Sequence, residues 1–218
     1  VPDWKLVGVV TRSADRRALL AEEAHGVAAF DSLDELIDAG VDAVVITTPP
    51  QTRRELVLRA LERGVNTVAD KPFAPDAAGA RELAAVAAES GVLLTVFHNR
   101  RWDTDVRTLA DVISRGELGE IWRVTSRFDL DDPATLEAGP AHGLLRDVGS
   151  HLVDQMIALF GPVARVDSHL DMTSIDGTEV DCGFVVTLHH RGGVTSTVSS
   201  SKLNHLHERE INAYGSQG

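Results

Sequence analysis

Three side chains that could exchange protons or bind a metal lie within one short stretch of the chain, residues 143–161. They are Asp147, His151 and Asp154, spaced four and then three positions apart. On a helix these spacings place side chains on one surface, where they can contact the same ligand. Histidine titrates nearest neutrality, so His151 is a candidate general base that a carboxylate could orient. A solvated acid and histidine pair is the plainer interpretation.

The same stretch is typical of a helix with one buried side. Gly161 followed by Pro162 ends it, because proline cannot continue a helix. The packed apolar side of this helix would therefore hold its polar face in a fixed position. The apolar residues that supply the buried flank are Leu152, Met156, Ile157, Leu159 and Phe160.

The composition indicates an ordinary globular protein, with 43% hydrophobic and 25% charged residues in a chain of 218. A formal net charge of -12 argues against a nucleic-acid partner and against an anionic membrane surface, and favours a small molecule. The single cysteine, Cys182, cannot form an intrachain disulfide. No signal-peptide core or membrane-spanning run is apparent, so we expect a cytoplasmic protein.

Strand and helix patterns alternate through the first part of the chain. The run 41–47 is β-branched without alternation, which is typical of a strand covered on both faces of a parallel sheet. The alternation predicts a doubly wound α/β sheet. Expected strands are 5–10, 41–47, 65–69 and 92–97, and expected helices are 14–25, 33–39, 53–63 and 76–90.

Ligands of such sheets bind beyond the carboxyl ends of the strands. This rule predicts a single rim made of residues 11–13, 47–50, 70–72 and 98–102. Arg12 follows a strand at the position that contacts the adenosine ribose, where arginine suits the 2′-phosphate of NADP and an acid would bond the hydroxyl of NAD. The residues therefore favour NADP, with NAD as the alternative, although an arginine in a solvated turn would look the same.

The pattern changes after an expected helix at 104–116. Extended runs with hairpin signals at 176–177 and 191–193 predict an α+β domain with a mostly antiparallel sheet. We expect domains at 1–102 and 103–218, both incomplete, because no glycine-rich phosphate turn precedes the first strand and the chain stops directly after the last one. The expected strands are 120–129, 164–174, 180–188, 193–201 and 208–214, interrupted by the 143–160 helix.

Several short motifs occur together in one order. They are Thr47-Thr48-Pro49-Pro50, Asp70-Lys71-Pro72, Asn99-Arg100-Arg101-Trp102-Asp103, Gly116-Glu117-Leu118-Gly119, Asp147-Val148-Gly149-Ser150-His151 with Asp154, and Tyr214-Gly215-Ser216 with Gly218. Together they resemble the Gfo/Idh/MocA family of nicotinamide-dependent oxidoreductases, and most closely its branch of NADP-dependent scyllo-inositol dehydrogenases.

The resemblance implies a Rossmann domain followed by a sheet-bearing substrate domain, assembled as a homodimer or homotetramer through the open face of the second sheet. It places Lys71, Asp147 and His151 at the catalytic positions. The chain departs from the family at Asp70, where glutamate is usual, and at Arg53, where many relatives carry histidine.

The rim supplies the expected cofactor contacts. Arg101 and Trp102 could line the substrate pocket together with Asp147 and His151. A tryptophan at this position could equally belong to the hydrophobic core. We expect four other histidines, His189, His190, His205 and His207, to be exposed or at interfaces. The expected cofactor-binding residues are Thr11, Arg12, Ser13, Thr47, Thr48, Pro49, Asp70, Lys71 and Asn99.

Oxidising a carbinol needs a base for the hydroxyl proton while hydride leaves for the nicotinamide. We predict His151 as that base, supported by Lys71 and Asp147, and the roles of His151 and Lys71 could be exchanged. The expected reaction is hydride transfer between NADP and a sugar or polyol hydroxyl; the alternative is a catalytically silent ligand-binding or regulatory protein. A metal-dependent isomerase or aldolase would need a further ligand that the chain does not obviously offer, so we expect no metal.

Overall fold

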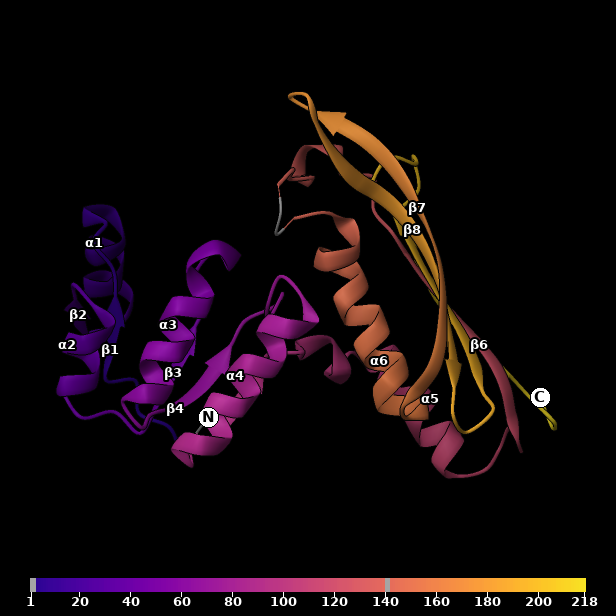
Figure 1. The fold of residues 1–218 in the computed structure, drawn as a ribbon, viewed down its shortest axis with the longest axis horizontal. Helices are drawn as coiled ribbons and strands as arrows, with labels where there is room; N and C mark the ends of the chain where they lie inside the picture. Colours follow the sequence, from indigo (N-terminus) through magenta and orange to yellow (C-terminus); the bar gives the residue numbers. More distant parts are fainter. Residues whose placement is uncertain (1–2, 140–141) are drawn as a thin grey trace. The chain divides into compact units, whose positions relative to one another are not determined.

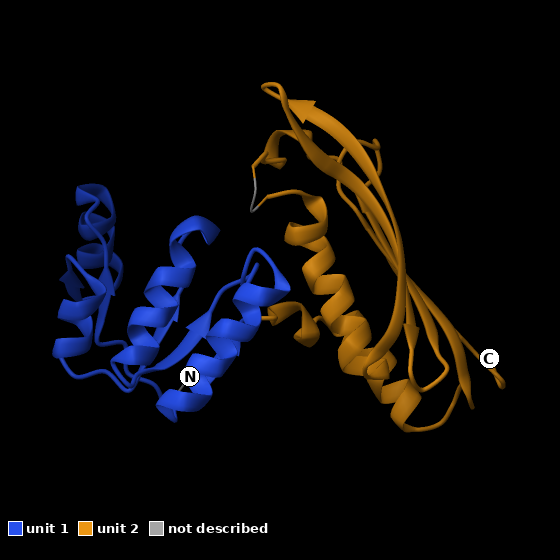
Figure 2. Cartoon of the chain, in the orientation of Figure 1, with its two compact units in different colours: residues 1–97 blue, residues 98–218 orange. Residues whose placement is uncertain are grey.

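The computed structural model describes residues 3–139 and 142–218. The chain forms two compact units, Val1–Phe97 and His98–Gly218, shown in different colours in Figure 2. The domain limits expected from the sequence, 1–102 and 103–218, stay a prediction. Across the described residues, no helix has the length and apolar character needed to cross a membrane.

The first unit alternates strands with helices, and every strand pairing in it is parallel (Figure 1). Its elements are β1 (Gly8–Val10), α1 (Ala14–Glu23), β2 (Ala28–Phe30), α2 (Leu33–Asp38), β3 (Ala43–Ile46), α3 (Pro50–Glu62), β4 (Asn66–Ala69), α4 (Ala77–Ser90) and β5 (Leu94–Val96). The prediction of a Rossmann-like parallel α/β unit is confirmed.

The strands form two sheets, β1-β2 and β3-β4-β5, rather than the single sheet expected from the sequence. Among the described residues no strand pairs with both β1 and β3, so the two sheets are not joined. The short strand β2 was not predicted. Its sequence is Ala-Ala-Phe, and alanine is not enriched in strands, so the pattern carries little signal.

Polar caps set the helix limits in this unit. Ser13, Ser32 and Asp76 each accept a hydrogen bond from a backbone amide in the first turn of the helix that follows. Gly91 ends α4 with a φ of 68°, a conformation that glycine adopts without strain. The apolar side chains of these helices and strands form the core of the first unit. Its best buried members include Val57, Ala60, Leu61, Ala69 and Leu83.

The second unit is a five-stranded sheet with helices, in the order β10-β6-β9-β8-β7. Three of its pairings are antiparallel and β6-β9 is parallel, which confirms the predicted mostly antiparallel sheet. The elements are η1 (Asn99–Trp102), α5 (Thr104–Ser114), β6 (Ile121–Asp129), η2 (Pro133–Thr135), η3 (Leu145–Gly149), α6 (Ser150–Phe160), β7 (Val163–Ile175), β8 (Thr178–His190), β9 (Thr195–Ser201) and β10 (Glu208–Gly215).

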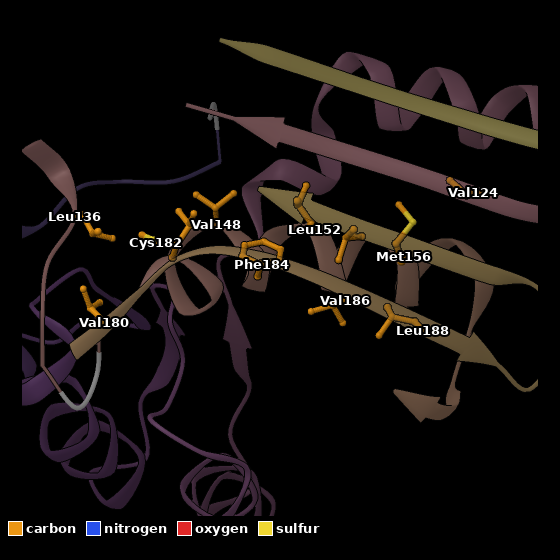
Figure 3. Packing of buried hydrophobic residues seen from close by; sticks show 12 residues of the cluster. Val124, Leu136, Val148, Leu152, Met156, Val180, Cys182, Phe184, Val186 and Leu188 are labelled. Carbon is orange, nitrogen blue, oxygen red and sulfur yellow. The ribbon is translucent and has the colours of Figure 1, made fainter. Parts of the chain in front are cut away.

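The core of this unit lies between α6 and one face of the sheet (Figure 3). Leu152 and Met156 of α6 belong to the same buried cluster as Phe184 and Val186 of β8. Gly149 permits this approach: a Cβ there would lie 2.6 Å from Leu145 Cδ1 and 3.0 Å from Phe184 Cζ. The helix that carries the candidate site is therefore packed closely against a rigid sheet.

His190 is buried, with 4% of its surface exposed, so the expectation of an exposed or interface position is wrong for this histidine. Its Nδ1 lies 2.9 Å from the Gly161 carbonyl and its Nε2 lies 2.8 Å from Ser196 Oγ. Because a carbonyl only accepts, Nδ1 carries the proton and Nε2 accepts from the serine. The ring thereby ties the end of α6 to β8 and β9.

Candidate functional site

Two of the predicted rim segments leave neighbouring strands of one sheet in the first unit. Ile46 at the end of β3 is paired with Ala69 at the end of β4, so residues 47–50 and 70–72 begin side by side. The amide of Asp70 donates to the Ile46 carbonyl at 3.0 Å. The amide of Lys71 donates to Asp70 Oδ1 at 2.8 Å, which fixes the turn that carries the lysine.

Arg53 connects these two rim segments. Its guanidinium donates to the Thr48 carbonyl at 2.5 Å and also to the Pro72 carbonyl, and only 3% of the residue is exposed. Burial lowers the pKa of Arg53 from its ordinary value, and the Asp70 carboxylate acts in the opposite direction. From the sequence, Arg53 was noted only as a departure from the family. Its position in the first turn of α3, directly after the rim segment 47–50, could have indicated that it contacts the rim.

Three other predicted cofactor residues lie at the end of β1, beside an open cavity of about 800 Å³. Thr11, Arg12 and Ser13 line it, and α3 contributes Arg54 and Arg59. Arg12 Nε donates to the Asp31 carbonyl at 3.2 Å, whereas Arg54 and Arg59 form ion pairs with Glu82 and Asp34. Thr47, Thr48, Pro49, Asp70 and Lys71 are not part of this lining.

In the second unit, Asp147 and His151 lie where two helical forms meet. The predicted single helix over 143–160 is corrected: a π-helical turn, η3, carries Asp147, and α6 begins at Ser150 with His151 in its first turn. A π turn is wider than an α turn and occurs often at functional sites. The expected four-residue α-helical spacing between these side chains therefore does not hold.

The start of the π turn is held by β8. Leu145 donates its backbone amide to Asp181 Oδ2 at 2.6 Å, which satisfies one of the amides that a helix start leaves without a partner. Gly143 precedes it with a φ of 108°, and a Cβ at that residue would lie 2.0 Å from Asp181 Oδ1. The glycine therefore leaves room for the acid at this entry into the helix.

Asp147 and His151 have different surroundings. The Asp147 side chain is 45% exposed, and its Oδ2 accepts a 3.2 Å hydrogen bond from Nζ of the buried Lys202. His151 is 5% exposed and makes an edge-to-face contact with the ring of His98 at a centroid distance of 6.3 Å. A half-exposed acid and a buried imidazole, carried by adjoining helical turns, are groups that can bind a hydroxyl and move its proton.

Asp154 is engaged by η1 rather than grouped with the other two. Arg101 donates two hydrogen bonds to it, at 2.7 and 2.6 Å, and His98 Nε2 lies 3.6 Å from its Oδ1. Burial lowers the pKa of His98; the Asp154 carboxylate opposes this shift and the Arg101 cation adds to it. The described residues contain no group of three or more His, Cys, Asp or Glu side chains placed to hold a metal ion.

The remaining predicted contacts lie on η1. Trp102 is 73% exposed and borders a small pocket of about 310 Å³ together with Arg101. Asn99 begins the element, and Gln155 of α6 donates to the Arg100 carbonyl at 2.8 Å. Substrate contacts by Arg101 and Trp102, and the cofactor contact by Asn99, stay predictions.

Comparison with known proteins covers both units. Residues 1–98 match the model of an oxidoreductase family with an NAD-binding Rossmann fold. Residues 106–218 match the GFO/IDH/MocA C-terminal domain. The chain spans about half the length of the first curated relatives that it matches, 50% and 51% for two of them.

Individual relatives show moderate identity. An uncharacterized oxidoreductase of Schizosaccharomyces pombe is 34% identical over 83% of this chain and 50% of its own. The scyllo-inositol 2-dehydrogenase (NADP(+)) IolW of Bacillus subtilis is 33% identical over 70% of this chain and 44% of its own. A crystal structure of a putative oxidoreductase from Klebsiella pneumoniae is 33% identical, with a TM-score of 0.84 over 99% of this chain and 59% of that one. The chain therefore belongs to the GFO/IDH/MocA family of oxidoreductases, with an NAD-binding Rossmann unit and the family's C-terminal domain.

Proposed function

We propose that the protein transfers a hydride between NADP, with NAD as the alternative, and a hydroxyl of a sugar or polyol. The observation that carries the proposal is the pair formed by buried His151 and half-exposed Asp147 on a helix start that the sheet holds in place. The relative named scyllo-inositol 2-dehydrogenase (NADP(+)) supports the substrate class and the choice of cofactor.

The residues of the first unit suit a dinucleotide. Arg12 and Ser13 line an open cavity beyond β1, where a guanidinium and a hydroxyl can bind a ribose phosphate. We assign the nicotinamide half to the rim beyond β3 and β4, residues 47–49 and 70–71, which Arg53 holds together. The bound nicotinamide supplies the hydride acceptor.

We assign the chemistry at the hydroxyl to three residues. His151 takes the hydroxyl proton, because an imidazole titrates near neutral pH. Lys71 donates a hydrogen bond to the substrate oxygen and favours its negative charge. Asp147 accepts a hydrogen bond from a substrate hydroxyl and orients the substrate against His151. If His151→Ala kept turnover within about threefold while Lys71→Ala abolished it, the roles of these two residues would be exchanged.

We also propose that a second copy of the chain covers the face of the five-stranded sheet opposite α6. This face carries the partly exposed apolar side chains of Val185 on β8 and Tyr214 on β10, whereas the alternating positions on β8 are buried. Light scattering after size exclusion should give a dimer or tetramer, and a monomer at micromolar concentration would contradict this.

The direct test is a titration of the intact protein with NADPH and with NADH, followed by a turnover screen with scyllo-inositol and other polyols and sugars. We expect tighter binding of NADPH, and Arg12→Ala should reduce that preference by about tenfold or more. Arg81→Ala is the matched control, because Arg81 is an exposed arginine of the same unit outside the cavity. Binding without turnover would favour a silent ligand-binding protein, and binding of neither cofactor would contradict the proposed hydride transfer by this chain.

A further inference from the structure

Lys202 is a buried lysine at the end of the central sheet of the second unit. It follows the last residue of β9, and only 4% of its surface is exposed. Its backbone amide donates to the Cys182 carbonyl at 3.0 Å, which anchors it to β8. An ammonium group seldom lies at such a depth, because removing it from water is costly without hydrogen-bond partners.

The ammonium group has two described acceptors. Nζ donates to Asp147 Oδ2 and to the Thr135 carbonyl, each at 3.2 Å. Asp147 is 55 positions away in the sequence, so the fold alone creates this ion pair. A carboxylate offers about four acceptor positions, and Lys202 occupies one of them.

The π turn is consequently held to the sheet at two points. Asp181 of β8 binds the amide of Leu145, and Lys202 at the end of β9 binds the side chain of Asp147 two residues later. The first contact fixes the backbone and the second fixes the carboxylate. The nearby cation Arg146 is directed elsewhere, since it donates to the His142 carbonyl at 3.2 Å.

We propose that Lys202 is a positioning residue for the reaction: it holds Asp147 Oδ2 toward the sheet, so that the carboxylate presents a fixed acceptor to the substrate hydroxyl. A held side chain loses less conformational entropy when substrate binds. This inference rests on the proposed function, because it assigns Lys202 a role through Asp147.

The test compares Lys202→Met, which keeps much of the length but removes the charge, with Lys202→Arg, which keeps the charge. In the intact protein, with NADPH and the best substrate of the screen, we expect the Met variant to lose at least about tenfold in kcat, the scale seen when the orienting partner of a reactive side chain is removed. The KM for NADPH should stay within about twofold, because the dinucleotide is assigned to the first unit. The Arg variant should recover most of the lost kcat.

A double variant separates positioning from general damage. Lys202→Met added to Asp147→Asn should lower kcat little beyond Asp147→Asn alone, because both changes break the same interaction. Arg191→Met, at an exposed arginine in the turn between β8 and β9, is the control for losing a cation. Melting curves identify variants that fail to fold. If Lys202→Met fails to fold, the kcat of the Lys202→Arg variant tests the proposal instead.

The outcomes separate the two proposals. If the unaltered protein binds NADPH but transfers no hydride to any substrate, the proposed function fails and the role of Lys202 fails with it. If the unaltered protein is active and Lys202→Met keeps kcat within about twofold, only the inference about Lys202 is overturned. It is also overturned if the Arg variant melts normally yet loses as much kcat as the Met variant, because charge would then not be the cause.

Discussion

The backbone amide of Leu145 donates a 2.6 Å hydrogen bond to the carboxylate of Asp181, a residue of the facing strand β8. A strand residue thus caps the π turn that carries Asp147. Helices are usually capped by a residue from the preceding loop, so this cap also ties the helix to the sheet.

Replacing Asp181 with alanine should lower the free energy of unfolding by about 1–2 kcal/mol, because the Leu145 amide loses its partner. Urea denaturation followed by circular dichroism measures the change. Glu179→Ala, at an exposed position of the same strand, should change it by less than about 0.5 kcal/mol. Equal effects of the two substitutions would show that the cap contributes nothing.

Gly143→Ala should destabilise the protein more than Asp181→Ala. Its φ of 108° is unfavourable for a residue with a side chain, and the added Cβ would lie 2.0 Å from Asp181 Oδ1. Strain of about 1–3 kcal/mol is expected from the backbone alone. Gly192→Ala is the control, since a Cβ there meets no atom within 4 Å. A melting temperature that is the same for both variants would contradict the argument.

Arg53→Met should loosen the rim of the first unit. The substitution leaves the partly buried Thr48 and Pro72 carbonyls without this donor, at a cost of about 1 kcal/mol or more for the pair. We expect a lower free energy of unfolding and weaker binding of NADPH, measured by urea denaturation and by fluorescence titration. Arg81→Ala should leave both quantities unchanged. Normal NADPH binding by a folded Arg53→Met protein would show that Arg53 does not organise the cofactor site.

The pKa of His98 should respond in opposite directions to its two charged neighbours. Arg101→Met removes a cation that lowers this pKa and should raise it, whereas Asp154→Asn removes an anion that raises it and should lower it further. An NMR titration of the His98 imidazole proton measures both shifts. Shifts of the same sign in the two variants would mean that the two charges do not act on the ring as the structure indicates.

The lowered pKa of His98 also links stability to pH. An unfolded histidine titrates near about 6.5, so below that pH the unfolded chain binds a proton that folded His98 binds less readily. The contribution of His98 to stability is therefore fully present above about pH 6.5 and is lost as the pH falls toward the folded pKa. His98→Gln should flatten the stability curve in this window in denaturation measured from pH 7.5 to 5.

The sequence predicts the elements whose pattern is strong and local. The unbroken β-branched run that contains β3 marks a strand, although burial on both faces was wrong, because Val45 is 61% exposed. Asp176-Gly177 marks the turn between β7 and β8. Spacing alone was not sufficient in residues 143–160, because an α turn and a π turn have the same sequence signature. The contact that holds the start of the π turn comes from Asp181, 36 positions from Leu145. Asp154 looked like a partner of His151 for the same reason, and Arg101 binds it instead.

Contacts between distant positions account for most of what the sequence missed. Lys202 is 55 positions from Asp147, and nothing next to it in the chain marks it as buried. Arg53 is 19 positions from Pro72, and its role depends on β3 and β4 ending side by side. His190 adjoins a glycine turn that suggested the surface, yet the end of α6 covers it.

Gly149 offers a way to adjust the chemistry without altering any reactive group. Because the hydrogen at its Cα faces Phe184, a single methyl group there would act as a spacer between helix and sheet. Asp147 and His151 lie on either side of this glycine, so both would be displaced as one block while their own side chains stayed intact. For protein engineering, the positions of Asp147 and His151 could be tuned together from the buried side of the helix.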